Sequence, residues 1–200
     1  MASGAVVHTL PAQPARITSL ALNPDNVAQL ITTSLCGSIR FWDYEEGVQV
    51  RAGSLGVPIV AAAVHPANAN AIVVAVPSDA ASGRVDEIWL VDVAQTQAKA
   101  ALVRKQRVLF TLKLACISVV WSPNARFIVA GGAKKELKVY QLHTSSVRET
   151  RVKVGISALD VSPADGVVAV GDKSGRITLW RCLSKKAAGR PLHKLSLIHI

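Results

Sequence analysis

The sequence has few cysteines, and none of them form a paired motif. Cys36, Cys116 and Cys182 are its three cysteines, and no C-x-x-C occurs. An odd count without that spacing argues against a disulfide framework and against a zinc site. We therefore expect three small buried side chains in a reducing compartment.

Long apolar runs are also missing. The longest, Val57–Val64, is far shorter than the ~20 residues that a membrane-spanning helix needs. The N-terminal stretch MASGAVVHTL has no basic segment followed by an apolar one, so it does not resemble a secretory signal. These absences predict an intracellular protein without a membrane partner.

No catalytic motif is present, since H-E-x-x-H, G-x-S-x-G and H-x-E with P-C-x-x-C are all lacking. The segment Gly131–Glu136, GGAKKE, lacks the spacing of a phosphate-binding loop, and we expect it to connect two strands. His65 is expected to be a structural turn residue, and Asp160, Asp165 and Asp172 to be turn formers or surface charges. The sequence thus predicts no enzyme, and no metal, cofactor or small-molecule substrate.

The charge is strongly basic and unevenly distributed. The net charge is +10, but residues 1–103 sum to −3 (5 Lys and Arg, 8 Asp and Glu), and residues 104–200 sum to +13 (18 and 5). A basic half of this kind is typical of contact with nucleic acid or an acidic partner. Charge alone names no ligand, and a soluble basic surface explains it equally well.

An internal repeat organises the chain. Four segments align, each with two short apolar strands and a third strand. Their first residues are 42, 58 and 39 positions apart, close to the ~40–45 residues of a four-stranded propeller blade in two of three cases. The segments are Ile17–Tyr44, Ile59–Val93, Ile117–Leu142 and Ile156–Cys182.

Two marks recur in each repeat. A proline follows the first strand, where its fixed φ and missing N–H suit a turn, and an aromatic residue ends the third strand, where we expect it to fill space between blades. They are 18, 23, 17 and 17 residues apart, and the long case indicates a loop insertion over Pro77–Asp86. Gly37 and Gly175 are expected in turns at positive φ. The aromatic residues are Trp42, Trp89, Tyr140 and Trp180.

The fourth strands are less clearly marked. Arg107–Leu114 alternates well enough to be the outer strand of the second blade, which makes Ala94–Gln106 an exposed insertion. Val147–Val154 is the matching candidate in the third blade, and Val6–Leu10 in a preceding one. The last six residues, LSLIHI, resemble translated vector sequence and suggest a foreign tail.

Residues 6–182 resemble WD-repeat proteins. Trp42-Asp43 is the dipeptide that gives the family its name, whereas the usual Gly-His before each blade is missing. Cys36 and Ser174 stand where the family's turn aspartate is expected. The resemblance implies an all-β WD-repeat β-propeller, with about four blades of a seven- or eight-bladed ring. The predicted divisions are 1–16 as preceding strand and linker, and blades at 17–58, 59–116, 117–155 and 156–200.

A narrower resemblance is to the WD-repeat protein 75 family. The pattern L-N-P-x-N, then Q-L, then S-x-x-G-x-I-x-x-W-D-Y-x-x-G occurs over Leu22–Gly47, and G-x-x-x-G-x-I-x-L-W-R over Gly171–Arg181. That family belongs to the small-subunit processome, which acts on pre-ribosomal RNA in the nucleolus. The resemblance therefore implies a nucleolar, non-catalytic scaffold that binds other protein subunits and pre-ribosomal RNA.

Basic residues of the second half are the candidate contacts for RNA phosphates or an acidic partner. No aromatic stacking platform accompanies them, so we predict no sequence-specific RNA recognition. A nuclear-localisation signal at Arg104–Arg107 is one alternative for part of the set, and a generic WD-repeat adaptor, such as a ubiquitin-ligase substrate receptor, is the alternative function. The candidates are Arg104, Lys105, Arg107, Lys134, Lys135, Lys138, Lys153, Lys185 and Lys186, with Arg148, Arg151, Arg190 and Lys194 beside them.

Overall fold

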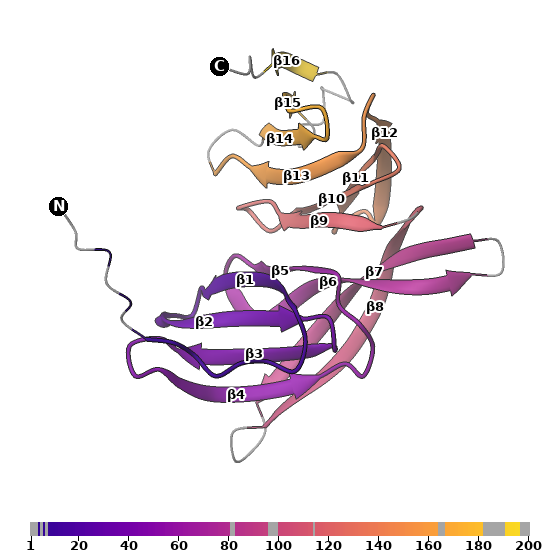
Figure 1. The fold of residues 1–200 in the computed structure, drawn as a ribbon. Helices are drawn as coiled ribbons and strands as arrows, with labels where there is room; N and C mark the ends of the chain where they lie inside the picture. The colour runs from indigo at the N-terminus through magenta and orange to yellow at the C-terminus, as the bar shows by residue number, and fades with distance from the viewer. Residues whose placement is uncertain are drawn as a thin grey trace.

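The computed structural model describes residues 4, 6, 8–80, 83–95, 100–113, 115–163, 167–181 and 191–196. Within these ranges every regular element is a strand. The strands form four separate four-stranded antiparallel sheets, each a simple meander in chain order. Figure 1 shows the sheets following one another in sequence, the first at the bottom and the fourth at the top. These are four blades of a β-propeller, as the repeat predicts.

The strand bounds follow the four repeats. Blade 1 contains β1 (Ile17–Asn23), β2 (Asn26–Ser34), β3 (Ser38–Asp43) and β4 (Val48–Ser54). Blade 2 contains β5 (Ala61–His65), β6 (Asn68–Ala80), β7 (Gly83–Gln95) and β8 (Ala101–Lys113). Blade 3 contains β9 (Cys116–Trp121), β10 (Phe127–Gly132), β11 (Glu136–Gln141) and β12 (Ser146–Arg151). Blade 4 contains β13 (Ile156–Val161), β14 (Val167–Asp172), β15 (Arg176–Arg181) and β16 (Pro191–Ser196).

The first strands of adjacent blades lie side by side, β1 with β5, β5 with β9 and β9 with β13. Three apolar cores fill the spaces between consecutive blades, and each core is formed by buried side chains of two adjacent sheets. Fully burying one such side chain stabilises the fold by ~1.5–3 kcal/mol, so the blades are held mainly by these contacts. The described part of the chain has no helix that is long and apolar enough to span a membrane.

Blade 2 is longer than the sequence pattern indicates. The predicted loop over Pro77–Asp86 is wrong in its described part, because residues 77–80 extend β6, residues 83–86 extend β7, and the two stretches pair with each other without a register shift. The predicted exposed insertion over Ala94–Gln106 is also wrong in its described part, since β8 begins at Ala101 and pairs with β7. Alternation within strand-like residues does not reveal whether extra length forms a loop or prolongs a hairpin.

The structure also differs from two smaller expectations about where strands form. The predicted strand over Val6–Leu10 is absent, since the described residues of this range are not in a strand. The outer strand of blade 3 ends at Arg151, before the predicted end at Val154. Of the tail residues, Leu195 and Ser196 belong to β16 and pair with β15, and the remainder lies outside the described residues.

In blades 2, 3 and 4, the aromatic residue of the third strand faces the preceding blade. Trp89 packs against the core shared by blades 1 and 2, Tyr140 lies in the core between blades 2 and 3, and Trp180 lies between blades 3 and 4. Trp42 is 1% exposed. Gln13 of the N-terminal segment donates a hydrogen bond at 2.7 Å to the Thr32 hydroxyl, which also accepts the Trp42 indole N–H.

Candidate nucleic-acid interface

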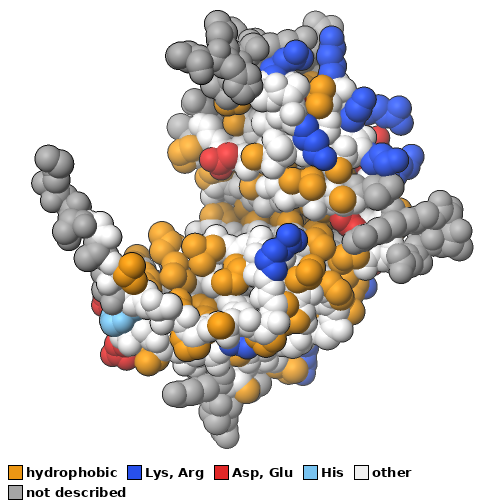
Figure 2. Space-filling model, viewed as in Figure 1, with side chains coloured by type: hydrophobic (Ala, Val, Ile, Leu, Met, Phe, Trp, Pro, Cys, Tyr) orange, Lys and Arg blue, Asp and Glu red, His pale blue; other side chains and the backbone are white. Residues whose placement is uncertain are grey.

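Six basic residues lie at one end of blades 3 and 4, on two turns and on the chain beside them. Five are exposed and Arg176 is half-buried. Figure 2 shows Lys and Arg side chains gathered over the half of the molecule formed by these two blades, whereas the other half is mainly apolar and neutral in this view. We call this set the blade 3–4 basic surface: Lys134, Lys135, Arg151, Lys153, Lys173 and Arg176.

Antiparallel pairing brings these residues together. The β10–β11 turn holds Lys134 and Lys135, and its end is fixed to the end of β12 because the Val152 N–H donates to the Lys135 carbonyl at 2.9 Å. The β14–β15 turn lies at the same end of blade 4, where the Lys173 N–H donates to the Gly155 carbonyl at 3.0 Å. The corresponding turns of two neighbouring blades therefore present their cations at the same end of the molecule.

Lys135 has an unusual backbone conformation for a lysine. Its φ is 69°, and the same turn position holds Gly37 at 83° in blade 1 and Gly175 at 77° in blade 4. A side chain in this left-handed region costs roughly 1–2 kcal/mol, whereas glycine adopts it freely. The protein thus keeps a cation at a position where conformation favours glycine, and such strain is common at functional sites.

The turn beside Arg176 is held by a carboxylate. Asp172 accepts hydrogen bonds from the Ser174 N–H at 2.8 Å, the Ser174 hydroxyl at 2.5 Å and the Arg176 N–H at 3.2 Å. The Ser174 hydroxyl is the main reason that the pKa of Asp172 is lowered. Ser174 thus takes part in a local network although it replaces the family's usual turn aspartate.

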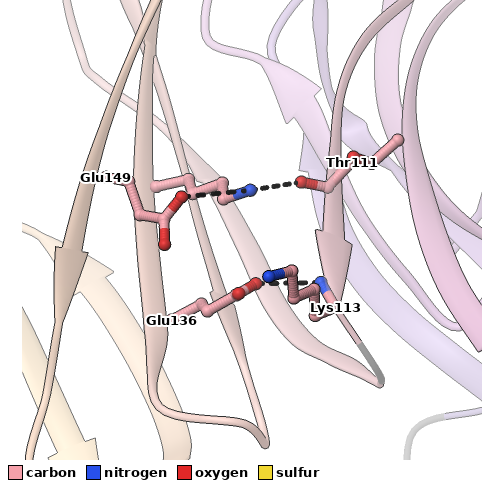
Figure 3. A network of polar contacts seen from close by, with 5 residues as sticks. Thr111, Lys113, Glu136 and Glu149 are labelled. Atoms are coloured by element: carbon pink, nitrogen blue, oxygen red, sulfur yellow. Dashed lines mark hydrogen bonds and ion pairs between the residues drawn. The ribbon is translucent and has the colours of Figure 1, made fainter.

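Lys138 has a structural position and differs from the other predicted contacts. Its side chain is 13% exposed, its Nζ lies 3.5 Å from the Glu149 carboxylate, and it donates to the Thr111 carbonyl at 2.8 Å (Figure 3). Beside it, buried Glu136 accepts a hydrogen bond from the Lys113 N–H at 2.8 Å. The Lys138–Thr111 and Glu136–Lys113 hydrogen bonds both join blade 3 to β8 of blade 2. Lys138 is therefore better placed to hold two blades together than to contact a phosphate.

Arg104, Lys105 and Arg107 lie on β8 and not in a loop. Lys105 Nζ is 3.7 Å from the ring centroid of Trp89 and 3.9 Å from the Glu87 carboxylate. β8 is the outer edge of its sheet, and its pairing with β7 has two register shifts. Charges and bulges at an edge prevent further strand pairing, which accounts for these three cations without a ligand.

The remaining basic candidates are placed as follows. Arg148 is exposed on β12, three residues before Arg151. Lys185, Lys186 and Arg190 lie outside the described residues, and Lys194 belongs to β16. The structure therefore splits the predicted set into the blade 3–4 basic surface, the β8 edge and the blade-joining Lys138.

Two buried charged residues that were not singled out from the sequence, Arg51 and Asp86, form hydrogen bonds between neighbouring blades. The Arg51 guanidinium lies 3.6 Å from the Phe41 ring centroid and donates to Asn70 of blade 2 at 2.8 Å. Asp86 is 0% exposed and accepts a hydrogen bond from the Cys116 N–H. A single charge in a strand has no periodic signal that distinguishes it from a surface charge.

The described residues do not form a group of His, Cys, Asp and Glu that would hold a metal. Burial, with the Asp86 carboxylate, raises the pKa of Cys116 to about 12, so this thiol stays protonated and is a poor nucleophile. The expectation that the cysteines are buried is wrong for Cys36, which is exposed. Cys182 lies outside the described residues. His65 has the predicted turn role, because its Nδ1 accepts the Ala67 N–H at 3.1 Å.

Comparison with known proteins places the chain among WD-repeat propellers. A family model described as the WD repeat-containing protein 75 first β-propeller matches residues 1–189. The chain belongs to this family. The match agrees with the narrower resemblance carried by Leu22–Gly47 and Gly171–Arg181.

Three curated relatives share the same name. WD repeat-containing protein 75 is 24% identical to this chain in Danio rerio, 25% in Homo sapiens and 26% in Xenopus laevis, over 196, 189 and 193 residues respectively. These alignments cover 88–90% of this chain but only 22–23% of the relatives. The chain therefore spans less than a quarter of their length.

Among solved structures, the Cps50 (Swd1) β-propeller domain of Myceliophteria thermophila is similar, with a TM-score of 0.68 and 16% identity. The likeness covers 94% of this chain and 60% of that one. At this identity it shows the fold alone. The coverage agrees with four blades that form part of a larger ring.

Proposed function

We propose that this propeller is a non-catalytic scaffold in ribosome biogenesis, located in the nucleolus, whose blade 3–4 basic surface contacts pre-ribosomal RNA. The observation that supports this most is the concentration of unpaired cations on two adjacent turns. Of the described Lys and Arg residues, only Lys105 and Lys138 have an ion pair with a carboxylate. The family supports the cellular role, since its members act in the small-subunit processome.

The contacts that we propose are with phosphates and not with bases. The basic surface comprises Lys and Arg on two turns and the neighbouring chain, and no exposed aromatic side chain is among its members. Phosphate contacts release counterions, so binding weakens steeply as salt increases, and they position a nucleic acid without reading its sequence. The propeller would thus hold RNA and leave sequence recognition to other subunits.

The cellular test uses the intact protein that contains this chain, tagged and expressed at its normal level. We expect nucleolar localisation, sedimentation with pre-ribosomal particles, and crosslinks to pre-ribosomal RNA that decline with salt. A diffuse cytoplasmic distribution with no sedimentation with pre-ribosomes would refute the proposal.

A second candidate function is a protein adaptor. It is favoured by a 710 Å³ groove at the opposite end of blade 3, lined by Phe127, Leu142 and His143, with Arg107 at the blade 2 side. This volume lies in the range of ligand-binding clefts. If purification of the tagged protein recovers a ubiquitin ligase and no RNA, the adaptor explains the protein better.

A further inference from the structure

A small pocket lies between blades 3 and 4, within the basic surface. It has a volume of 160 Å³, which equals about five water molecules at ~30 Å³ each. Its walls include three cations from three separate segments: Arg151 at the end of β12, Lys153 in the connection to β13, and Arg176 at the start of β15. A pocket of this size accommodates one small polar group and not a drug-sized ligand.

The cations around the pocket outnumber the acids. Asp172 is the one carboxylate among its lining residues, and it already accepts three hydrogen bonds from Ser174 and Arg176. None of the three cations is within ion-pair distance of a carboxylate in the described part of the chain. Like charges held around one small space repel one another, and a bound anion removes this repulsion.

One residue that lines the pocket also carries a buried hydrogen-bond donor without a partner. Trp180 lines the pocket and is 7% exposed, and its buried Nε1–H has no hydrogen-bond partner among the described residues. In blade 1, by contrast, the equivalent Trp42 donates to the Thr32 hydroxyl at 2.9 Å. A buried polar group without a partner is uncommon and costs about 1–3 kcal/mol.

Register shows why the two blades differ. On β2, Thr32 lies two residues after Leu30, which pairs with Trp42 of β3. On β14, Val170 likewise lies two residues after Val168, which pairs with Trp180 of β15. Val170 therefore replaces the hydroxyl that accepts the indole N–H, and it lines the pocket. The indole donor of blade 4 therefore has no acceptor on β14, and both Val170 and Trp180 border the pocket.

Blade 1 shows what this position holds when the chain itself fills it. Gln13 donates to Thr32 at 2.7 Å and accepts from the Ser38 hydroxyl at 3.4 Å. Thr32 and Ser38 occupy the places of Val170 and Arg176 in blade 4. A polar side chain thus occupies the site in blade 1, whereas in blade 4 the same site is lined by cations.

We infer that the pocket between blades 3 and 4 binds a single phosphate group of an RNA backbone. A phosphate offers oxygens in several directions, which suits donors that arrive from β12, the β12–β13 connection and β15. Exposed Lys134, Lys135 and Lys173 on the flanking turns suit the neighbouring phosphates of the same strand. The inference rests on the proposed function and adds a defined binding pocket for one phosphate group of the RNA.

The test compares two variants of the intact protein with equal loss of charge. One carries Lys153→Gln and Arg176→Gln, and the control carries Arg104→Gln and Arg107→Gln on β8. Affinity for a fluorescein-labelled oligouridine is measured by anisotropy over a salt series. We expect the pocket variant to bind about tenfold more weakly, with a salt slope lower by about 0.7 per lost contact, and the control to change less than about twofold.

A third variant keeps the test informative if Arg176→Gln unfolds blade 4. Val170→Thr adds an acceptor for the Trp180 N–H without changing charge, so it should weaken oligouridine binding while the melting temperature rises. In the wild-type protein, orthophosphate should compete with the oligouridine and shift the Trp180 indole N–H resonance, whereas the Trp42 resonance should not move.

The outcomes separate this inference from the proposed function. Equal oligouridine binding by the pocket variant, the control and the wild type would overturn the pocket and leave the basic surface as the RNA contact. No oligouridine binding by the wild type would overturn both. Preferential binding of a phosphoserine peptide over oligouridine would show that the phosphate comes from a protein, which contradicts the RNA assignment.

Discussion

Replacing Lys135 by glycine should stabilise the fold and weaken RNA binding at the same time. The φ of 69° costs a side chain roughly 1–2 kcal/mol, and glycine removes this cost. Glycine also gains freedom in the unfolded chain, which opposes folding by roughly 0.5–1 kcal/mol. The net expectation for Lys135→Gly is a gain of about 0.5–1 kcal/mol. The exposed side chain loses no ion pair.

Lys134→Gly is the matched control, because it removes the same charge from the same turn without a positive φ to relieve. It should cost roughly 0.5–1 kcal/mol, so urea unfolding of the intact protein should separate the two variants by about 1–2 kcal/mol. Both should bind oligouridine more weakly than the wild type. Equal destabilisation by the two substitutions would refute the claim that Lys135 is kept against its conformational preference.

Three further outcomes follow from the blade interfaces. Val170→Thr should stabilise by about 1 kcal/mol, since it supplies the buried Trp180 N–H with an acceptor, as measured by urea unfolding. Trp42→Ala should cost about 3–5 kcal/mol by the same assay, because the side chain is fully buried. Cys116 should resist alkylation up to a pH near its pKa of about 12, while exposed Cys36 is modified near neutral pH, as peptide mass spectrometry of the folded protein would show.

Each of these outcomes has a result that would contradict it. Val168→Thr places a hydroxyl at the residue that pairs with Trp180, where blade 1 has Leu30 and not the acceptor Thr32, so it should destabilise. A similar gain in stability from both substitutions would count against the Val170 argument. Unchanged stability after Trp42→Ala would contradict the burial of the Trp42 side chain. Alkylation of Cys116 at the same rate as Cys36 would show that burial does not suppress its thiolate.

Stability at alkaline pH follows from the same thiol. Because the pKa of Cys116 is about 12 in the folded protein against 9.0 for a free thiol, the unfolded state loses this proton first. The contribution of Cys116 to stability is complete below pH 9 and is lost as the pH rises through 12. Cys116→Ala should therefore show a shallower loss of stability over this window than the wild type.

The architecture could be predicted because its signals repeat. Proline after the first strand and an aromatic residue in the third recur in four segments, and the strands form at those places. The length of blade 2 could not be predicted in the same way, because Pro77 lies within β6 and its flanking residues resemble those of a loop. Cross-strand pairing, which the sequence does not display, decides between the two.

The basic surface was predictable only in part. Net charge indicated the second half of the chain, and Lys134, Lys135 and Lys153 lie on the surface that the structure defines. Lys138 could not be separated from them, since its role depends on Thr111 and Glu149, which are distant in sequence. Arg176 joins the site only through the packing of blade 4 on blade 3.

Crosslinking of pre-ribosomal RNA to the intact protein tests the central claim most directly. Charge reversal at Lys134, Lys135 and Lys153 is compared with charge reversal at Arg104 and Arg107, in cells and with nucleolar localisation checked for both. We expect that only the first variant loses crosslinks and sedimentation with pre-ribosomes. Equal crosslinking by the first variant and the wild type would contradict it.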